Sequence, residues 1–293
     1  MSLVRELFGN YSKRNDINWG RVIAEQLCPY SGKSCYKVRK SEPSISIGVC
    51  TVEYGGCPGI MICPNRMLER QQIFNDCLHL LTMHEPGNEL HLLPEVSIPG
   101  GSVDYFLISA RGLKVIDFVG IELQTLDTTG SIWSERSALV QSKGVTVNKD
   151  DLSKKNFGMN WKMSAKTILV QMHHKIDTFE NLNKHLVLVI QDCFYDYMAK
   201  EFNFAPLRPA LLGDSFHIHS YSLDDNQVAL RIRLSDRKST DSAGLSLSLG
   251  LQAEAKVDLE EIVEYLERRM SDTTLLRNLN QIDLRYTYLK FSD

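Results

Sequence analysis

The sequence predicts a mixed α/β (α+β) fold, in which helices flank a mixed central sheet and a small cysteine-rich module lies near the N-terminus. Three observations support this fold class. Residues 103–126 read as two strands joined by a tight turn. Residues 164–202 carry the apolar spacing of helices. Five of the seven cysteines lie between residues 28 and 63.

The expected elements follow from the spacing of apolar residues, because helices repeat them every three or four positions and half-buried strands alternate them. In order, the patterns predict helices over 19–27 and 66–83, a strand over 90–98, a hairpin of strands 103–110 and 113–126, a polar loop over 128–158, helices over 164–176 and 178–202, strands over 216–221 and 227–234, a mobile Ser/Gly-rich segment over 237–250, and a helix over 258–270.

Local signals refine three of these elements. Pro94 restricts the strand over 90–98 to an irregular or edge position. The hairpin is expected to turn at Arg111-Gly112. The sequence DLEE opens the last helix, so Asp258 can cap it and Glu261 can reach back to the cap.

The length and composition are those of a globular protein. At ~150 residues per domain, 293 residues allow one large domain or two small ones. The first residues, MSLVRELFGNYSKR, lack the apolar segment of a signal peptide. No apolar run approaches the ~20 residues that span a bilayer. We therefore expect a soluble cytoplasmic protein without a membrane partner.

The charge is unevenly distributed along the chain. The net charge of −3 argues mildly against nucleic acid as a partner, but residues 136–175 hold eight basic and two acidic residues, a local balance of +6. Such a stretch can face phosphates. From charge alone, a solvated surface balanced by acids elsewhere is the favoured interpretation.

The cysteines predict a structural metal site. They occur in CPYSGKSC, GVC and GGCPGIMIC, and a chain without a signal peptide is not expected to use them as disulfides. Four thiolates on turns suit a tetrahedral ion such as iron or zinc, and leave no open position for chemistry. Ordinary buried thiols are the alternative. We expect residues 1–66 to hold this module and residues 67–293 to form the core.

A second set of polar residues lies on the predicted hairpin. Glu122 and Gln124 are two apart in VGIELQTLD, so they share one face of the strand. Pairing around the predicted turn places Asp104, from SVDYFLIS, opposite Val119 and close to Glu122. Two carboxylates in this position can hold Mg²⁺ with several waters, and the Leu123 carbonyl can add a ligand.

This Asp…Glu-x-Gln pattern is the constellation of the PD-(D/E)XK nucleases. The metal acidifies a bound water and neutralises charge on the phosphate that the water attacks. Gln124 stands where lysine usually orients that water, and Glu89 can add a further carboxylate. The alternative is an edge strand whose polar face meets solvent.

The chain resembles the NotI family of type II restriction endonucleases over roughly residues 25–180. The resemblance is carried, in chain order, by CPYSGKSC, GVCTV, ICPNRML, NEL at 88–90, VDYFL, GIELQT and ILVQMHHK. It implies a PD-(D/E)XK restriction-endonuclease-like core with a four-cysteine, iron-binding module. The implied metal ligands are Cys28, Cys35, Cys50 and Cys63, and Cys57 is an additional cysteine. The implied catalytic residues are Asp104, Glu122, Gln124 and Glu89.

The activity implied by the resemblance is Mg²⁺-dependent cleavage of double-stranded DNA at a GC-rich palindromic site. Water would attack phosphorus in line, leaving 5′-phosphate and 3′-hydroxyl ends. A palindromic target suits a two-fold homodimer.

Two other functions fit part of the pattern. A non-catalytic DNA-binding or scaffold protein with a zinc or iron module would keep the cysteines and the basic stretch, but would not need the acidic motif. An iron–sulfur nuclease of CRISPR adaptation or recombinational repair usually divides its cysteines between distant segments and has lysine in the motif. Here the cysteines lie near the N-terminus and the motif has Gln124.

Overall fold

The computed structural model describes residues 2–152, 157–226, 228–250, 263–264 and 267–268. The chain forms two compact units, Met1–Leu251 and Gln252–Asp293, and the elements discussed below belong to the first. The predicted helix over 258–270 lies almost wholly outside the described residues. The predicted division at residue 66 stays a prediction. Within the described residues, every helix is too short or too polar to span a bilayer.

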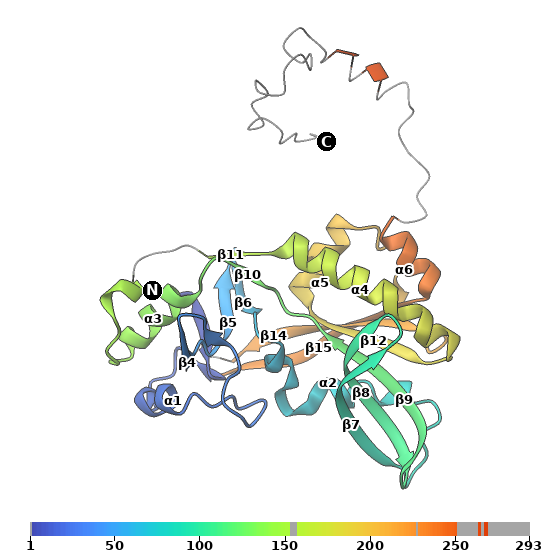
Figure 1. Cartoon of the computed structure of the whole chain (residues 1–293), viewed down its shortest axis with the longest axis horizontal. Helices are drawn as coiled ribbons and strands as arrows, with labels where there is room; N and C mark the ends of the chain where they lie inside the picture. The colour runs from blue at the N-terminus through green and yellow to red at the C-terminus, as the bar shows by residue number, and fades with distance from the viewer. Residues whose placement is uncertain (1, 153–156, 227, 251–262, 265–266, 269–293) are drawn as a thin grey trace. The chain divides into compact units, whose positions relative to one another are not determined.

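A mixed sheet forms the centre of the first unit (Figure 1). Its strands are β7 (Glu89–Ile98), β8 (Gly101–Arg111), β9 (Lys114–Leu123), β12 (His185–Gln191), β13 (Arg208–Pro209), β14 (Phe216–Asp225) and β15 (Leu230–Thr240). Their order across the sheet is β13-β15-β14-β12-β9-β8-β7. β12 runs parallel to β9 and β14, and the other neighbours are antiparallel. The predicted mixed sheet, the β8–β9 hairpin and the edge position of β7 are confirmed.

The strand β12 corrects the prediction of a helix over 178–202. The chain instead forms α4 (Trp161–Asn181), then β12, then α5 (Asp192–Glu201). Every residue of β12 is buried. A strand covered on both faces has a continuous apolar sequence, which periodicity alone does not distinguish from a buried helix.

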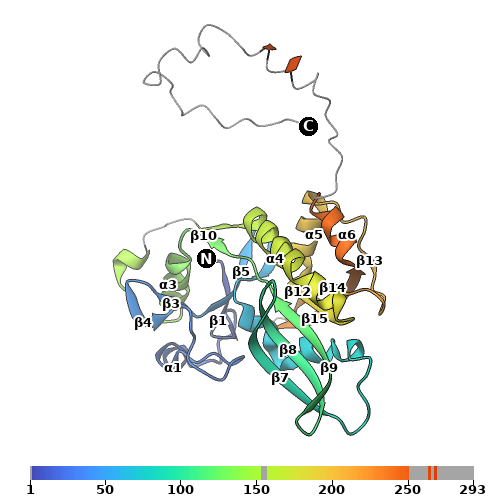
Figure 2. The same cartoon turned by 45° about the vertical axis from the view of Figure 1, so that its right-hand side comes forward.

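Helical segments cover both faces of the sheet (Figures 1 and 2). On one face α4, α5 and α6 (Ser242–Ser248) bury Met172, Phe194 and Leu245 in the larger apolar core. On the other face lie the short segments η1 (Pro64–Gln71), α2 (Gln72–Asn75) and η2 (Leu78–Leu80). Their Met67 and Phe74 pack in a second apolar core.

The single helix predicted over 66–83 is wrong, because the chain breaks at residues 69–71. Glu69 is extended, and both Arg70 and Gln71 adopt left-handed backbone angles with φ of 54° and 56°. The break turns the Glu69 carboxylate toward β15, where it accepts a hydrogen bond from the Ile232 amide at 2.9 Å. A tertiary contact therefore interrupts the apolar spacing that predicts a continuous helix.

The N-terminal region contains its own small sheet. Its strands are β1 (Val4–Leu7), β2 (Asn10–Tyr11), β5 (Val49–Tyr54) and β6 (Cys57–Met61), and β3 (Val38–Arg39) pairs separately with β4 (Glu42–Ser46). The helix predicted over 19–27 is present as α1 (Trp19–Glu25). The Asn18 side chain caps it by accepting a hydrogen bond from the Arg21 amide.

Two segments predicted to lack regular structure are ordered. The expected loop over 128–158 contains β10 (Thr128–Thr129), α3 (Trp133–Ser142) and η3 (Lys149–Leu152), and β11 (Gly158–Met159) follows. α3 forms because Leu139 and Val140 reach the main core. The segment expected to be mobile over 237–250 continues β15 to Thr240 and then forms α6, which Asp241 caps by accepting from the Gly244 amide at 2.8 Å.

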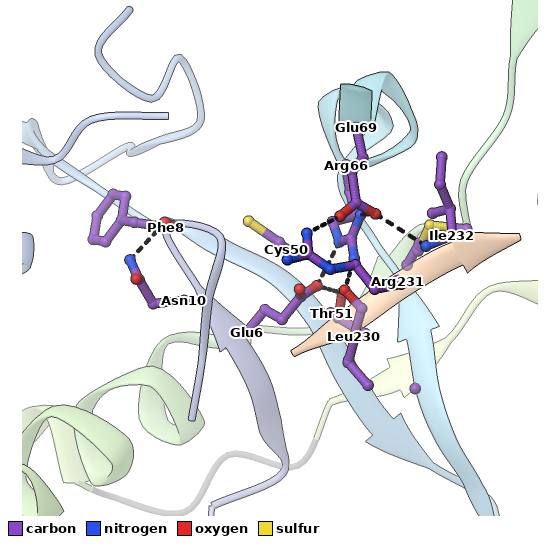
Figure 3. A network of polar contacts seen from close by, with 12 residues as sticks. Glu6, Phe8, Asn10, Cys50, Thr51, Arg66, Glu69, Leu230, Arg231 and Ile232 are labelled. Carbon is purple, nitrogen blue, oxygen red and sulfur yellow. Dashed lines mark hydrogen bonds and ion pairs between the residues drawn. The ribbon is translucent and has the colours of Figure 1, made fainter. Parts of the chain in front are cut away.

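A buried arginine joins three parts of the first unit (Figure 3). The Arg66 guanidinium, 0% exposed, donates to Glu6 on β1 at 2.7 Å and to Glu69 on η1 at 2.9 Å. It also donates to the Leu230 carbonyl on β15 at 2.8 Å. Thr51 on β5 donates to the same Glu6 carboxylate. A charge buried this completely is tolerated only because its donors are satisfied.

Replacing Arg66 with Met is expected to destabilise the protein by about 3–5 kcal/mol, because two carboxylates lose their buried partner. Urea unfolding measures the change. Arg233→Met is the matched control, since Arg233 pairs with Asp224 at 2.9 Å on the surface and should cost less than about 1 kcal/mol. Equal stability losses in the two variants would contradict the structural role of Arg66.

Two histidines of β14 are buried in the core. His217 Nε2 lies 2.9 Å from the Asp214 carbonyl oxygen, and His219 Nδ1 lies 3.7 Å from Cys77 Sγ. Burial lowers the pKa of His217 to about 4 and that of His219 to about 2, and the nearby Arg237 charge lowers the latter further. The folded protein therefore keeps both rings neutral well below their ordinary pKa of 6.5.

The variant His219→Gln is expected to lose part of the acid sensitivity of folding. Below about pH 6.5 the unfolded chain protonates His219 and the folded chain does not, so stability falls as the pH falls. One such proton changes the free energy of unfolding by ~1.4 kcal/mol per pH unit. Urea unfolding between about pH 6.5 and 5 measures this slope. His91→Gln, at an exposed position, is the control, and a wild-type slope in His219→Gln would contradict the assignment.

Candidate active site and cysteine cluster

The hairpin of β8 and β9 brings Asp104 and Glu122 together, although not in the predicted register. Val119 was the predicted neighbour of Asp104 but pairs with Leu107. Arg111 pairs with Lys114, so the turn lies one residue later than predicted and moves the register by two residues, and a bulge beside Ser109 adds one more. Asp104 therefore lies beside the end of β9. Its Oδ2 accepts a hydrogen bond from the Leu123 amide at 2.8 Å.

Lys175 from α4 completes this cluster. Its Nζ donates to Glu122 Oε1 at 2.5 Å, and both side chains are buried, 6% and 5% exposed. From the sequence, Lys175 is one charge of the basic stretch and the last residue of ILVQMHHK, and no catalytic role was predicted for it. A signal was present, because Ile168, Met172, Lys175 and Phe179 recur at helical spacing and place the lysine on the buried stripe of the helix.

Glycines let α4 approach the strands closely enough for this contact. A Cβ at Gly100, in the turn between β7 and β8, would lie 2.1 Å from the His174 carbonyl oxygen of α4. A Cβ at Gly120 on β9 would lie 2.3 Å from the Phe179 ring. A helix side chain therefore fills the space beside Gly120.

Burial controls the electrostatics of the cluster. It raises the pKa of Glu122 to about 7, against the opposing effect of the Lys175 hydrogen bond, and the Asp104 charge raises it further. Burial also raises the pKa of Asp104, whereas the Leu123 amide and Lys175 lower it. Two neighbouring carboxylates with raised pKa values and one buried ammonium are typical of a functional site.

The other motif residues take different positions. The Gln124 side-chain amide donates to the Thr125 carbonyl at 2.5 Å, and the Gln124 backbone amide donates to Val189 on β12 at 3.0 Å. Leu123 contributes its backbone next to Asp104. The Gln124 side chain thus turns toward its own backbone, while the Leu123 peptide lies at the carboxylates.

Of the acidic residues on β7, Glu95 and not Glu89 lies across from Asp104. Glu89 pairs with Ala110, six residues along β8 and so roughly 20 Å from Asp104. Glu95 has a left-handed backbone, with φ of 54°, and stands between the pairs Pro94–Tyr105 and Val96–Val103. Its charge raises the pKa of Asp104. The structure therefore does not bring Glu89 to the site and places Glu95 there.

The four cysteines predicted as metal ligands line one small cavity. Cys28 and Cys35 flank a turn in which the Cys28 amide donates to the Lys33 carbonyl at 2.8 Å. Cys50 lies on β5 and Cys63 directly precedes η1. The cavity is about 10 Å³, roughly the space of one water molecule. Lys37 also lines it, and its charge favours a thiolate at Cys63, although burial raises that pKa overall.

The additional cysteine, Cys57, belongs to a different pair. Its thiol shares a hydrogen bond with that of Cys193. The Gln191 side chain holds the two segments together, because it accepts from the Met61 amide at 2.8 Å and donates to the Gly59 carbonyl at 2.6 Å. Cys57 is therefore separate from the four-cysteine cavity.

In the described part of the chain, no three Cys, His, Asp or Glu side chains form a group that could hold a metal ion. No protein-family model matches the chain, and no curated protein matches its sequence. The resemblance to the NotI family therefore rests on the sequence motifs alone. The four-cysteine metal site and the Mg²⁺ site at Asp104 and Glu122 are both proposals.

Replacing Glu95 with Gln is expected to lower the pKa of Asp104, because a neighbouring negative charge is removed. Carbon-13 NMR titration of the aspartate carboxyls measures the shift. Glu89→Gln is the control and should leave the Asp104 titration unchanged. An effect of Glu89→Gln equal to that of Glu95→Gln would contradict the placement.

Proposed function

We propose that this protein is a type II restriction endonuclease with a PD-(D/E)XK core, which cleaves double-stranded DNA at a specific, GC-rich palindromic site. The observation that carries the proposal is the cluster of half-buried Asp104 with buried Glu122 and Lys175. Two acids with raised pKa values lie on neighbouring strands, and a lysine from α4 meets them. The two acids are those that the resemblance to the NotI family implies as catalytic residues.

The residues have separate roles in the proposed reaction. Asp104 and Glu122 would hold Mg²⁺, and the Leu123 carbonyl can add a backbone oxygen, a ligand set suited to a hard cation that keeps several waters. When bound, the ion acidifies water and neutralises phosphate charge. Gln124 stands at the water-orienting position of the motif, and its amide must leave the Thr125 carbonyl to act there.

The proposed chemistry is hydrolysis of a phosphodiester. The oxygen of water forms a bond to phosphorus as the bond from phosphorus to O3′ breaks in line. The water gives up a proton and O3′ takes one, so the products are a 5′-phosphate and a 3′-hydroxyl. The neighbouring acid Glu95 increases the negative charge of the site and so favours cation binding.

The four cysteines that line the cavity would hold a structural iron or zinc ion after their sulfurs move closer together, since the described side chains do not already form a metal-binding group. Cys28, Cys35, Cys50 and Cys63 line one space of about 10 Å³, and thiolates are the ligands that these ions prefer. Burial raises the pKa values of Cys50 and Cys63, so the metal-free protein keeps these thiols protonated. Metal binding would release their protons and draw the sulfurs together.

A palindromic target requires two active sites in two-fold symmetry, so we propose that the protein acts as a homodimer in the cytoplasm. Guanine O6 and N7 would be read by Arg or Lys in the major groove. Phosphate contacts from the basic stretch would make binding salt-sensitive.

A non-catalytic DNA-binding or scaffold protein with a zinc or iron module is the second candidate. It would keep the cysteine cavity and the basic residues. A non-catalytic protein would have no need for the buried pair of Glu122 and Lys175 beside Asp104. Replacing a buried ion pair with apolar residues of similar size often leaves the stability of a protein unchanged or raises it. The buried cluster therefore favours the nuclease.

The purified protein is expected to cut unmethylated, GC-rich genomic DNA into discrete fragments only when Mg²⁺ is present. Asp104→Asn should lower cleavage by at least about 100-fold while DNA binding persists, because the cation loses a ligand. Asp127→Asn, at an exposed position close to the motif, is the matched control and should cut normally. Failure of the folded, metal-loaded protein to cut would favour the non-catalytic candidate, and a smear would exclude sequence-specific cleavage.

Purified protein is expected to contain about one iron or zinc ion per chain at the four-cysteine site. Cys28→Ser should lose the ion and lower the melting temperature, because metal binding contributes to folding. Elemental analysis, the optical spectrum and thermal unfolding measure these effects. Cys57→Ser is the control and should keep the metal. A stable, metal-loaded and active Cys28→Ser protein would contradict the assignment.

A further inference from the structure

We propose that Lys175 occupies the cation position of the active site in the DNA-free protein and must release Glu122 before a divalent ion binds. This inference rests on the proposed function and assigns a role to a residue outside the motif. It starts from the contact of 2.5 Å between Lys175 Nζ and Glu122 Oε1, two side chains that are almost fully buried. The ammonium thus occupies one oxygen of a carboxylate that is proposed to bind the metal.

The charges of the cluster make the two cations competitors. Asp104 and Glu122 together carry two negative charges when both are ionised, and the Lys175 ammonium offsets one of them. A divalent ion would meet both the repulsion of this ammonium and the cost of separating it from Glu122. Because the cluster is buried, these interactions are screened less than on the surface. Lys175 therefore weakens metal binding when DNA is absent.

The surrounding structure fixes the backbone of Lys175 but allows the ammonium to move. The turn before β8 packs against α4, where Gly100 meets the His174 carbonyl and Gly101 leaves room for the Lys175 side chain. Thr178 also donates to the Pro99 carbonyl at 3.0 Å. A lysine has a flexible four-carbon stem, so its ammonium can leave Glu122 without a shift of the helix.

The displaced ammonium would remain beside the two carboxylates, where the scissile phosphate of bound DNA lies in the proposed reaction. A positive charge there stabilises the negative charge that develops on phosphate oxygens in the transition state. Gln124 at the motif position is uncharged and faces the Thr125 carbonyl. Lys175 would therefore supply from α4 the charge that the motif itself lacks.

Calorimetric titration of the DNA-free protein with Mn²⁺, up to millimolar concentrations, tests the competition. Lys175→Met keeps the apolar stem and removes the charge, so it should bind Mn²⁺ about tenfold more tightly or better. Lys184→Met is the matched control, because Lys184 forms a partly buried pair with Asp117 at 2.6 Å away from the motif. Its affinity should equal that of the wild type. Unchanged, weaker or undetectable binding by Lys175→Met would overturn the proposal.

Cleavage by the same variants tests the second role. At saturating Mn²⁺, Lys175→Met should cut DNA at least about 100-fold more slowly than wild type, whereas Lys184→Met should not change the rate. Normal cleavage by Lys175→Met would contradict the proposed contact between Lys175 and the phosphate. Circular dichroism checks the fold, and Lys175→Gln replaces Lys175→Met in both measurements if the latter does not fold.

Two further variants separate this inference from the proposed function. Asp104→Asn and Glu122→Gln should lose Mn²⁺ binding. If both bind Mn²⁺ like the wild type, the cluster is not a metal site and the nuclease proposal fails with it. If both lose binding and Lys175→Met shows no gain, only the role of Lys175 fails.

Discussion

The buried guanidinium of Arg66 is the interaction on which the arrangement of the first unit depends. It connects Glu6 of the N-terminal sheet, Glu69 of the broken helical segment and the backbone of β15 in the central sheet. Each partner satisfies a different nitrogen, so the three elements are fixed together by one charge. The left-handed turn at residues 70–71 follows from this arrangement, because Glu69 must face both Arg66 and the Ile232 amide.

The cysteine cavity and the candidate active site are connected through β6. This strand leads to Cys63, and its Met61 carbonyl accepts a hydrogen bond from Leu126, which closely follows the acidic motif. Gln191, at the end of β12, binds the same strand through two backbone groups. A metal that orders the cysteine segment would therefore stabilise a strand in contact with the residues that follow the candidate active site.

The candidate active site combines residues from one hairpin with a residue from a distant helix. The hairpin supplies the two carboxylates, and α4 supplies the buried ammonium across the close contacts at Gly100 and Gly120. The pKa of Glu122, about 7, is a balance between burial and this ammonium. A divalent ion bound beside Glu122 would lower the pKa of this carboxylate, as the Lys175 ammonium does in its absence.

The hairpin, the edge position of β7, the mixed sheet and the adjacency of Asp104 to Glu122 could be predicted from local residue patterns, because these features depend on alternation and one short turn. The sequence by itself did not determine β12, whose continuous apolar run suits a buried strand or helix equally. The predicted strand register was wrong by three residues, because the turn lies one residue later than its sequence signal and a bulge follows it. Glu89 was expected in place of Glu95, because the pairing of β7 with β8 cannot be known from the spacing of the acids along the chain. Only the tertiary structure brought Lys175 to Glu122, because 53 residues separate them along the chain and packing of α4 on the sheet closes that distance.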